Sequence, residues 1–397
     1  MSKQSFRELG VSQPVIDALS ARAIIHPFRI QELVLPDALA GLDVLAKSPT
    51  GSGKTLAFAV PIVQRTLPTD SRPSALVLVP TRELAAQVTA DIEPLAKVCG
   101  LSVVAAYGGM PLRSQANRAK GAQILVATPG RLHDLAERRL VDLSGVRTFI
   151  LDEADRMLDM GFKPQVDRIV RRLPKNRQTM FFSATLDGQV GRLARAYTND
   201  ARLHEVESPR ETVDEADHKF VSVTAQGKAD ALVELLKGDY GKTLVFVRTK
   251  RGADRLAWKL RGQGIKCVAM HGDLSQPVRE RALRDFESGK TDVLVATDIA
   301  ARGLDLERIS HVVNYDPPED DKSYVHRVGR TARAGNTGTG VTFVTPEQQG
   351  DIGRMAARLQ LGDDFEAEGD MKVAPPRIVY SGKAGRYSNL RRQRARR

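Results

Sequence analysis

Short runs of apolar, often β-branched residues recur along the chain, and each is followed by a segment with helical periodicity. The runs are ALVLVP (75–80), QILVAT (123–128), TFILDEA (148–154), TMFFSAT (179–185), KTLVFVRT (242–249), KCVAMHG (266–272), DVLVATD (292–298), HVVNYD (311–316) and GVTFVT (340–345). Because these runs are apolar throughout instead of alternating, they are typical of parallel strands covered by helices on both faces. The pattern predicts an α/β protein with doubly wound parallel sheets.

A polar interval divides this pattern in two. Residues 205–217 (EVESPRETVDEAD) include a proline and lack apolar periodicity, which is typical of a linker. The 397 residues suit two domains of average size. We therefore expect a first domain over residues 1–204, a linker over 205–217 and a second domain over 218–360. Residues 361–397 would then form an acidic and then basic tail.

The composition is that of a globular protein, with 42% hydrophobic and 27% charged residues. Apolar runs such as 56–63 fall far short of a membrane span, and the N-terminal MSKQSFRELG has no apolar core that could serve as a secretory signal. Cys99 and Cys267 lie far apart without metal-ligand spacing, which argues against a zinc site or a disulfide framework. We expect a cytoplasmic monomer with no membrane segment and two inert thiols.

Most of the net charge of +12 lies at the C-terminus. Residues 371–397 contain no acid and nine basic residues, which leaves +3 for the rest of the chain: Lys372, Arg377, Lys383, Arg386, Arg391, Arg392, Arg394, Arg396 and Arg397. Such a tail attracts polyanions through counterion release, without sequence preference. A solubilising tail without a partner is the alternative. An acidic stretch precedes the tail and could pair with it: Asp363, Asp364, Glu366, Glu368 and Asp370.

The stretch KSPTGSGKTLAF (47–58) is similar to a phosphate-binding loop, but Ser48 replaces the first glycine of the usual G-x-x-x-x-G-K-[ST]. That position needs only a small side chain. Glycines let backbone N–H groups converge on phosphates, Lys54 adds a point charge, and Thr55 would ligate Mg²⁺. A plain Ser/Gly linker is the alternative. The candidate nucleotide ligands are Ser48, Thr50, Gly51, Ser52, Gly53, Lys54 and Thr55.

An apolar strand that ends in acids follows about a hundred residues after this loop, in FILDEAD (149–155). Asp152 is placed as the second Mg²⁺ contact that a nucleotide site requires. The adjacent Glu153 would then act as the base that polarises the attacking water. A carboxylate pair that caps the next helix is the alternative, which the preceding loop disfavours.

DEAD at 152–155, taken with the loop, resembles the DEAD-box ATP-dependent RNA helicases of superfamily 2, in their bacterial type. Further motifs follow in the family's order: HPFRIQ (26–31), PTRELAAQ (80–87), Gly108-Gly109, TPGR (128–131), SAT (183–185), FVRT (246–249), HGDLSQPVRER (271–281), ATDIAARGLD (296–305) and HRVGRTARAG (326–335). The resemblance covers residues 6 to about 345 and leaves out the tail. It implies two tandem RecA-like domains with ATP between them.

The resemblance also implies roles at the nucleotide. Gln31 would read adenine, Phe6 would stack on it, and Asp305 would contact the ribose. Arg330 and Arg333 would reach the γ-phosphate as arginine fingers in cis. The chain departs from the family at Phe28-Arg29, where Thr-Pro is commoner, and at Ser48-Pro49, where Ala-Gln is commoner. Neither departure removes a catalytic group.

Other motifs match the segments with which the family holds RNA and couples its two domains. The implied RNA contacts are Thr81, Arg82, Gly109, Thr128, Gly130, Arg131, Arg248, Gln276, Arg279 and Thr297. The implied coupling residues are Ser183, Thr185, His326 and Arg327. Since aromatic residues make up only 5% of the chain, we expect this surface to hold phosphates and sugars and to read no sequence.

The activity that this resemblance implies is RNA-stimulated ATP hydrolysis coupled to local separation of short RNA duplexes. RNA that spans both domains would favour their closure and so complete the catalytic site. Two alternatives stay open, namely a DNA translocase or repair helicase built on the same core, and an ATP-gated RNA clamp. The sequence does not decide between ribosomal precursors and the mRNA decay machinery as the setting.

Overall fold

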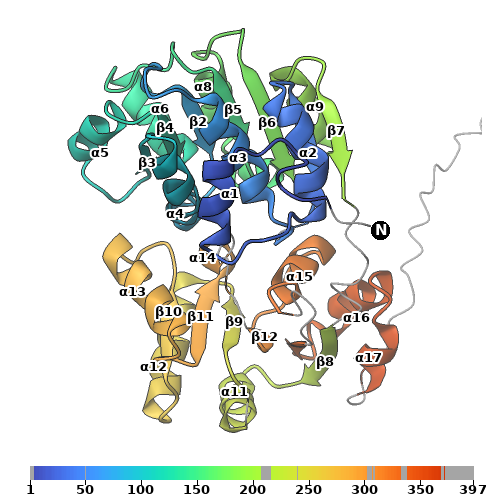
Figure 1. Ribbon diagram of the computed structural model, residues 1–397. Coiled ribbons are helices and arrows are strands. Elements are labelled where there is room, and N and C mark those ends of the chain that lie inside the picture. The colour runs from blue at the N-terminus through green and yellow to red at the C-terminus, as the bar shows by residue number, and fades with distance from the viewer. Residues whose placement is uncertain are drawn as a thin grey trace, which may run out of the picture.

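The computed structural model describes residues 4–49, 51–206, 216–238, 240–301, 306, 309–331, 338–367 and 371. Two parallel sheets, one above the other in Figure 1, form the centres of two α/β domains. This arrangement confirms the predicted fold class. Within the described ranges, none of the helices combines the length and the apolar character that crossing a membrane requires.

The first domain is built on a seven-stranded sheet in the order β3-β4-β2-β5-β6-β1-β7, in which every neighbouring pair is parallel. Its strands are β1 (Val44–Lys47), β2 (Ala75–Leu78), β3 (Val103–Ala106), β4 (Ile124–Ala127), β5 (Thr148–Leu151), β6 (Gln178–Ser183) and β7 (Arg202–Glu205). Its helices are α1 (Gln13–Ser20), α2 (Arg29–Leu39), α3 (Lys54–Arg65), α4 (Arg82–Val98), α5 (Leu112–Ala119), α6 (Pro129–Glu137), α7 (Ala154–Asp159), α8 (Lys163–Val170) and α9 (Gly188–Tyr197).

The second domain is built on a six-stranded parallel sheet in the order β10-β11-β9-β12-β13-β8. Its strands are β8 (Ala216–Ser222), β9 (Thr243–Val247), β10 (Cys267–Met270), β11 (Val293–Thr297), β12 (His311–Asn314) and β13 (Gly338–Val344). Its helices are α11 (Lys228–Lys237), α12 (Lys250–Gly262), α13 (Gln276–Glu287), α14 (Asp298–Ala301), α15 (Asp321–Val328), α16 (Gln349–Arg358) and α17 (Gly362–Ala367).

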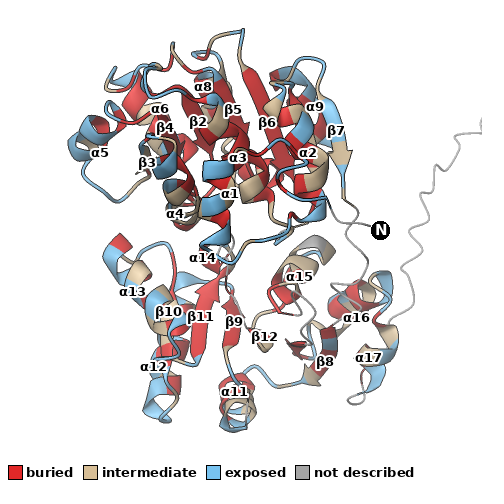
Figure 2. Cartoon of the chain, viewed as in Figure 1, coloured by how far each residue is buried: buried red, intermediate tan, exposed pale blue. Residues whose placement is uncertain are grey.

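Successive residues of the central strands pack into hydrophobic clusters on opposite faces of each sheet. In β2, Val77 belongs to one cluster and Leu76 and Leu78 to another. In β9, Val245 and Phe246 divide in the same way between two clusters. Figure 2 shows the central strands buried and the outward faces of the helices exposed. Burial on both faces explains why these strands read as unbroken apolar runs.

Four strands lie outside the apolar runs of the sequence. β1 (VLAK) and β3 (VVAA) alternate buried and partly buried residues, and β7 (RLHE) is largely exposed at the edge of its sheet. β8 (ADHKFVS) alternates buried and exposed residues at the edge of the second sheet. A search for continuous apolar runs misses strands that have one face only partly covered.

The segment between the domains and the end of the chain are described only in part. β7 ends at Glu205 and β8 begins at Ala216, so both strands reach into the range for which the sequence predicts a linker. Residues 207–215 lie outside the described residues, as do Glu368, Asp370 and the basic residues at 372–397. Helix α17 carries the first acidic residues of the tail, and Met371 is buried against the second domain.

Candidate nucleotide and RNA site

The loop before α3 has a serine pair where the usual formula has its first glycine. Ser48 is buried, and its hydroxyl accepts a hydrogen bond of 3.0 Å from the hydroxyl of Ser52, which also donates to the carbonyl of Pro49. Lys54 Nζ donates to the carbonyls of Ser48 and Pro49 at 2.9 and 2.7 Å. Ser48 therefore joins the two ends of the turn by its side chain, which glycine cannot do.

Gln31 ties helix α2 to this loop. Its side-chain amide donates to the carbonyl of Gly53 at 2.8 Å and accepts from the backbone N–H of Phe28 at 2.9 Å. Gly53 has a φ of +87°, and a Cβ there would lie 2.4 Å from the ring of Phe28 and 2.6 Å from Gln31 Nε2. The exposed ring of Phe28 thus packs against the loop.

Phe6, the predicted adenine-stacking residue, lies in the hydrophobic core of the first domain. Its side chain is only 3% exposed and belongs to the cluster that includes Leu9, Val11 and Val15. The ring of Phe6 packs in this core, and its stacking on adenine stays a prediction. Thr50 and Asp305, two other predicted nucleotide contacts, lie outside the described residues.

Asp152 and Glu153 follow β5 at the edge of the sheet next to the loop. Burial raises the pKa of Asp152 to about 7, opposed by the charge of Lys54. Burial also opposes ionisation of Glu153, but the charges of Arg156, Arg330 and Lys54 hold its pKa below the ordinary value. Glu153 forms an ion pair of 2.6 Å with Arg156. The pKa of Asp152 is thus raised and that of Glu153 is lowered, as in catalytic sites in which one of two neighbouring carboxyl groups must be ionised.

Asp155 connects this strand end to the SAT segment after β6. Its backbone N–H donates to the hydroxyl of Ser183 at 3.3 Å, and its carboxylate accepts from Thr185 at 3.4 Å. Ser183 also accepts from the backbone N–H of Thr185. The structure brings the predicted coupling residues of the first domain into direct contact with the DEAD segment.

A narrow pocket of about 40 Å³ lies between the two domains at this point. Its lining residues are Lys54, Glu153, Asp155, Arg156, Asp159 and Ala184 from the first domain, and His326 and Arg330 from the second. Arg330 is close enough for its charge to lower the pKa of Glu153. The second predicted finger, Arg333, lies outside the described residues.

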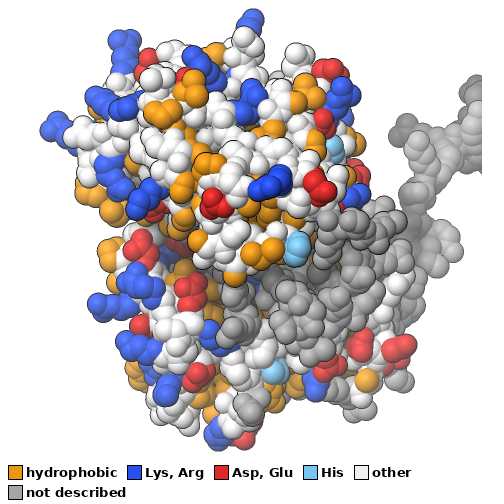
Figure 3. All heavy atoms as spheres, in the orientation of Figure 1, with side chains coloured by type: hydrophobic (Ala, Val, Ile, Leu, Met, Phe, Trp, Pro, Cys, Tyr) orange, Lys and Arg blue, Asp and Glu red, His pale blue; other side chains and the backbone are white. Residues whose placement is uncertain are grey.

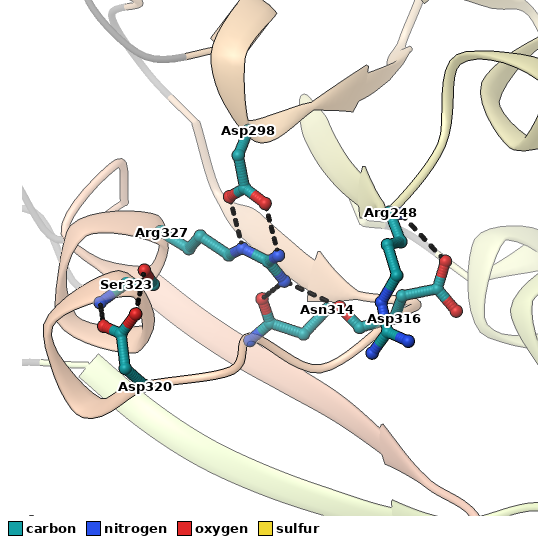
Figure 4. A network of polar contacts seen from close by, with 7 residues as sticks. All are labelled: Arg248, Asp298, Asn314, Asp316, Asp320, Ser323 and Arg327. Carbon is teal, nitrogen blue, oxygen red and sulfur yellow. Dashed lines mark hydrogen bonds and ion pairs between the residues drawn. The ribbon is translucent and has the colours of Figure 1, made fainter. Parts of the chain in front are cut away.

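The hydrogen bonds of Arg327 to described residues lie within the second domain, and its role in coupling the domains stays a prediction. Its guanidinium donates two bonds of 2.7 Å to Asp298, one of 3.0 Å to Asn314 and one of 2.6 Å to the carbonyl of Asp316 (Figure 4). The group also lies over the ring of Phe246. A buried, four-bonded arginine of this kind holds α15 in place.

The predicted RNA contacts lie where strands end and helices begin. Thr81 and Thr128 cap α4 and α6, Arg248 and Thr297 stand at the ends of β9 and β11, and Gln276 opens α13. Carboxyl ends of parallel strands are the usual binding edge of such sheets. The sequence motifs therefore meet along one edge of each domain.

Side chains of the first domain hold this edge in shape. The guanidinium of Arg82 lies against Gly109, where a Cβ would come within 2.6 Å of it. Gly109 has a φ of +89°. Arg131 donates to the carbonyl of Met110 at 3.0 Å and to the side chain of Gln115. Gly130, at the exposed start of α6, leaves space above the helix.

Arg279 is paired with Glu83, and its role as an RNA contact stays a prediction. The ion pair joins the two domains at 2.8 Å, with only 8% and 5% of the two side chains exposed. Gln276, one turn earlier, is also buried and lies near Gly109. Burial lowers the pKa of Arg279, while Glu83 opposes this shift. In this arrangement Arg279 joins the two domains through its ion pair with Glu83.

Comparisons with known proteins agree with this geometry. Residues 28–193 match the family model DEAD/DEAH box helicase, and residues 227–335 match Helicase conserved C-terminal domain. The chain belongs to the DEAD-box family of ATP-dependent RNA helicases. It is 41% identical over 350 residues to the DEAD-box ATP-dependent RNA helicase CshA of Geobacillus kaustophilus, covering 88% of this chain and 75% of that protein.

Further DEAD-box relatives give the same result. The Bacillus subtilis CshA helicase is 38% identical over 347 residues, covering 87% of this chain and 70% of that protein. The solved structure of S. cerevisiae Dbp5 bound to RNA and ADP BeF3 superposes with a TM-score of 0.81 at 33% identity, covering 90% and 94% of the two chains. A DEAD box protein from Methanococcus jannaschii covers 91% and 98% with a TM-score of 0.52 at 35% identity. This chain is accordingly an RNA-dependent ATPase and RNA helicase, and the DNA translocase alternative falls away.

Two functional residues of the site were missed in the sequence. Arg156 stands three residues after Glu153 on one helix face, a spacing at which opposite charges meet, so the pair could have been found. Glu83 lies within the PTRELAAQ motif, but its partner Arg279 is about two hundred residues away in the other domain. No local sequence pattern predicts this ion pair.

Proposed function

We propose that this DEAD-box chain couples ATP hydrolysis to local separation of short RNA duplexes, and that it holds the sugar-phosphate backbone without reading sequence. The observation that carries the proposal is the pocket between the domains, which places Lys54 and Glu153 opposite Arg330 and His326. Neither domain alone contains both halves of this set. Catalysis would therefore depend on closure, which is the step that RNA can control.

The loop would hold the phosphates of ATP, with Lys54 exchanging the carbonyls of Ser48 and Pro49 for phosphate oxygens. A Mg²⁺ ion fits beside Asp152, because the nearly buried carboxyl has a pKa of about 7 that a cation would lower. Thr55 is the second ligand that we propose. Mg²⁺ needs few protein ligands when phosphates and water supply the others, and it would neutralise charge that develops on the phosphates.

Glu153 is the base that we propose for the attacking water. Its lowered pKa keeps it ionised at neutral pH, so it can orient and polarise a water molecule. Arg156 fixes the carboxylate at 2.6 Å and so limits its rotation. Arg330 would act as a finger that stabilises the transferred charge, with Arg333 as the second finger. The hydroxyls of Ser183 and Thr185, which contact Asp155, would shift when the site changes between ATP bound and ATP hydrolysed.

RNA would lie along the strand ends of both domains. Threonines and glycines at helix N-termini offer hydroxyls and backbone N–H groups to phosphates, and Arg82, Arg131 and Arg248 add charge. These groups carry no base-specific pattern. Discrimination of RNA from DNA would come from contacts to the 2′-hydroxyl.

The experiment that tests the proposal measures ATP hydrolysis with no nucleic acid, with single-stranded RNA, and with DNA of the same sequence. We expect stimulation by RNA alone, followed by release of a strand from a short duplex when ATP is present. Equal stimulation by DNA would contradict the proposed backbone recognition. Strand release with a non-hydrolysable ATP analogue at the same level as with ATP over many cycles would favour a clamp.

The variant Glu153→Gln isolates the chemical step. It should bind ATP and RNA as the parent does, because the amide keeps the size of the side chain, but turnover should fall by about a hundredfold or more. Filter binding of RNA with ATP gives the first quantity and phosphate release gives the second. Near-normal turnover in Glu153→Gln would remove its role as base.

A further inference from the structure

Helix α12 (Lys250–Gly262) carries several charged side chains, and only some of them have ion-pair partners within the described part of the chain. Three of its charged residues have ion-pair partners at its flanks, in the pairs Lys250–Asp273, Asp254–His271 and Lys259–Asp230. Arg251 and Arg255 are exposed, and no ion pair or hydrogen bond joins their side chains to any residue that the structure describes. Arg251 and Arg255 therefore leave two positive charges available, besides that of the exposed Arg261 in the last turn of the helix.

The two arginines share a helix face with the only tryptophan of the chain. Arg251, Arg255 and Trp258 stand at i, i+4 and i+7, a spacing that aligns side chains in one stripe. Trp258 is 74% exposed, the highest fraction among the large exposed hydrophobic side chains of the described chain. We call these three residues the α12 stripe.

The core of the second domain does not need the α12 stripe. The opposite face of the helix packs into the domain through Ala253, Leu256, Ala257 and Leu260, all buried. An exposed indole costs solubility and adds nothing to this packing. A planar aromatic flanked by free cations is the composition of surfaces that bind single-stranded nucleic acid.

The α12 stripe continues the proposed RNA edge. Thr249 caps the helix and follows Arg248, a proposed RNA contact at the end of β9. At 1.5 Å per residue, the stripe reaches about 10 Å from Arg251 to Trp258, directed away from the strand ends. In Figure 3, Lys and Arg side chains, with Asp and Glu side chains among them, lie along the lower left margin of the molecule, where Figure 1 places α12 and α13.

We propose that the α12 stripe is a second RNA contact, which binds the strand after it leaves the cleft between the domains. Arg251 and Arg255 hold phosphates, and the indole of Trp258 stacks on a base. The inference rests on the RNA-binding function proposed above. It assigns an aromatic stacking residue to the second domain, and it makes affinity depend on RNA length.

Fluorescence of Trp258 tests this directly, because the chain has no other tryptophan. The full chain, with a non-hydrolysable ATP analogue, is titrated with RNAs of about 6 and about 20 nucleotides, lengths that bracket common single-strand site sizes. We expect the longer RNA to quench the emission and the shorter one to leave it nearly unchanged. Both RNAs should stimulate ATP hydrolysis.

Two variants separate stacking from charge. Trp258→Ala should weaken binding of the longer RNA roughly fivefold to a hundredfold and leave the shorter one unchanged. Arg251→Gln with Arg255→Gln should reduce the slope of log affinity against log salt by about 1.4 for the longer RNA, since two phosphate contacts are lost. Arg192→Gln with Arg195→Gln, on exposed positions of α9 in the first domain, removes the same charge and should change neither.

Each outcome decides the inference. Quenching by the longer RNA only, lost with the Arg251/Arg255 variant, supports the second contact. The second contact is overturned if RNA stimulates hydrolysis without quenching the emission, or if Trp258→Ala binds the longer RNA as tightly as the parent does. Either result leaves the proposed function intact, and the α12 stripe would then fit a protein partner. No stimulation of hydrolysis by either RNA overturns the proposed function first and the α12 stripe with it.

Discussion

Neutralising Glu83 should loosen the closed arrangement of the domains. In that arrangement Glu83 and Arg279 form a 2.8 Å pair with 5% and 8% of the side chains exposed. Glu83→Gln leaves the charge of Arg279 buried without its partner, which costs about 3 kcal/mol in comparable buried pairs. The cost applies only when the domains are closed, because Arg279 is solvated when they separate.

A loss of about 3 kcal/mol corresponds to roughly a hundredfold change in the closing equilibrium. Water that enters beside the new amide reduces this figure, so we expect at least about a tenfold rise in the RNA concentration for half-maximal ATPase stimulation. ATP affinity without RNA should stay the same, whereas the basal ATPase rate should fall, because basal hydrolysis also requires closure. Steady-state hydrolysis measured against RNA concentration gives the two hydrolysis quantities, and nucleotide titration without RNA gives the ATP affinity.

A matched control and a double variant define the refutation. Asp91→Asn breaks the pair Arg22–Asp91 inside the first domain, where about a third of each side chain is exposed, and should cost less than about 1 kcal/mol of stability with no effect on RNA dependence. Glu83→Arg with Arg279→Glu should restore part of the stimulation that each single change removes. If Arg279→Glu alone weakens RNA binding and the double variant recovers nothing, Arg279 contacts RNA and the interdomain reasoning fails.

Three further predictions concern the nucleotide site and the tail. Burial raises the pKa of Asp152 to about 7, so its ionisation destabilises the fold as pH rises through that value, whereas Mg²⁺ needs the carboxylate. Mg·ATP binding should therefore tighten between about pH 6 and 8 and release a proton. Calorimetry in two buffers detects this proton release, which should be absent in Asp152→Asn. Gly53→Ala should abolish ATP binding, whereas Gly51→Ala should keep most of it, because Gly51 has a similar φ but no atom within 4 Å of the added Cβ. If nucleotide titration shows the same loss of ATP affinity in both variants, backbone strain alone is the cause. Truncation after the buried Met371 should weaken RNA binding and flatten its salt dependence without altering the basal ATPase, and an unchanged salt slope would leave the tail a solubilising segment.

The fold was predictable from the sequence wherever strands are buried on both faces. The run at 75–80 became β2 and the run at 242–249 became β9, because central strands need apolar side chains on both sides. The sequence pattern did not predict the edge strands β7 and β8, which lack an unbroken apolar run. Their polar side chains face solvent, so composition does not distinguish them from loops.

The site was predictable as far as local motifs carry it. Lys54, Asp152 and Glu153 could be assigned because each belongs to a short motif with its own chemistry. The burial of Phe6 and Arg279 could not be predicted in the same way, since it depends on which distant residues pack against them. Sequence patterns state which groups are present, whereas exposure is set by the tertiary structure.

The bonds of Arg327 have a consequence for how this chain can evolve. His326 and Arg330 lie on either side of Arg327 in sequence and both line the pocket between the domains. Asp298 and Asn314, which hydrogen-bond to Arg327, lie at the ends of two different strands. A change at either position would therefore shift His326 and Arg330, two residues of the pocket between the domains, at once. Asp298, Asn314 and Arg327 should therefore be replaced together or not at all.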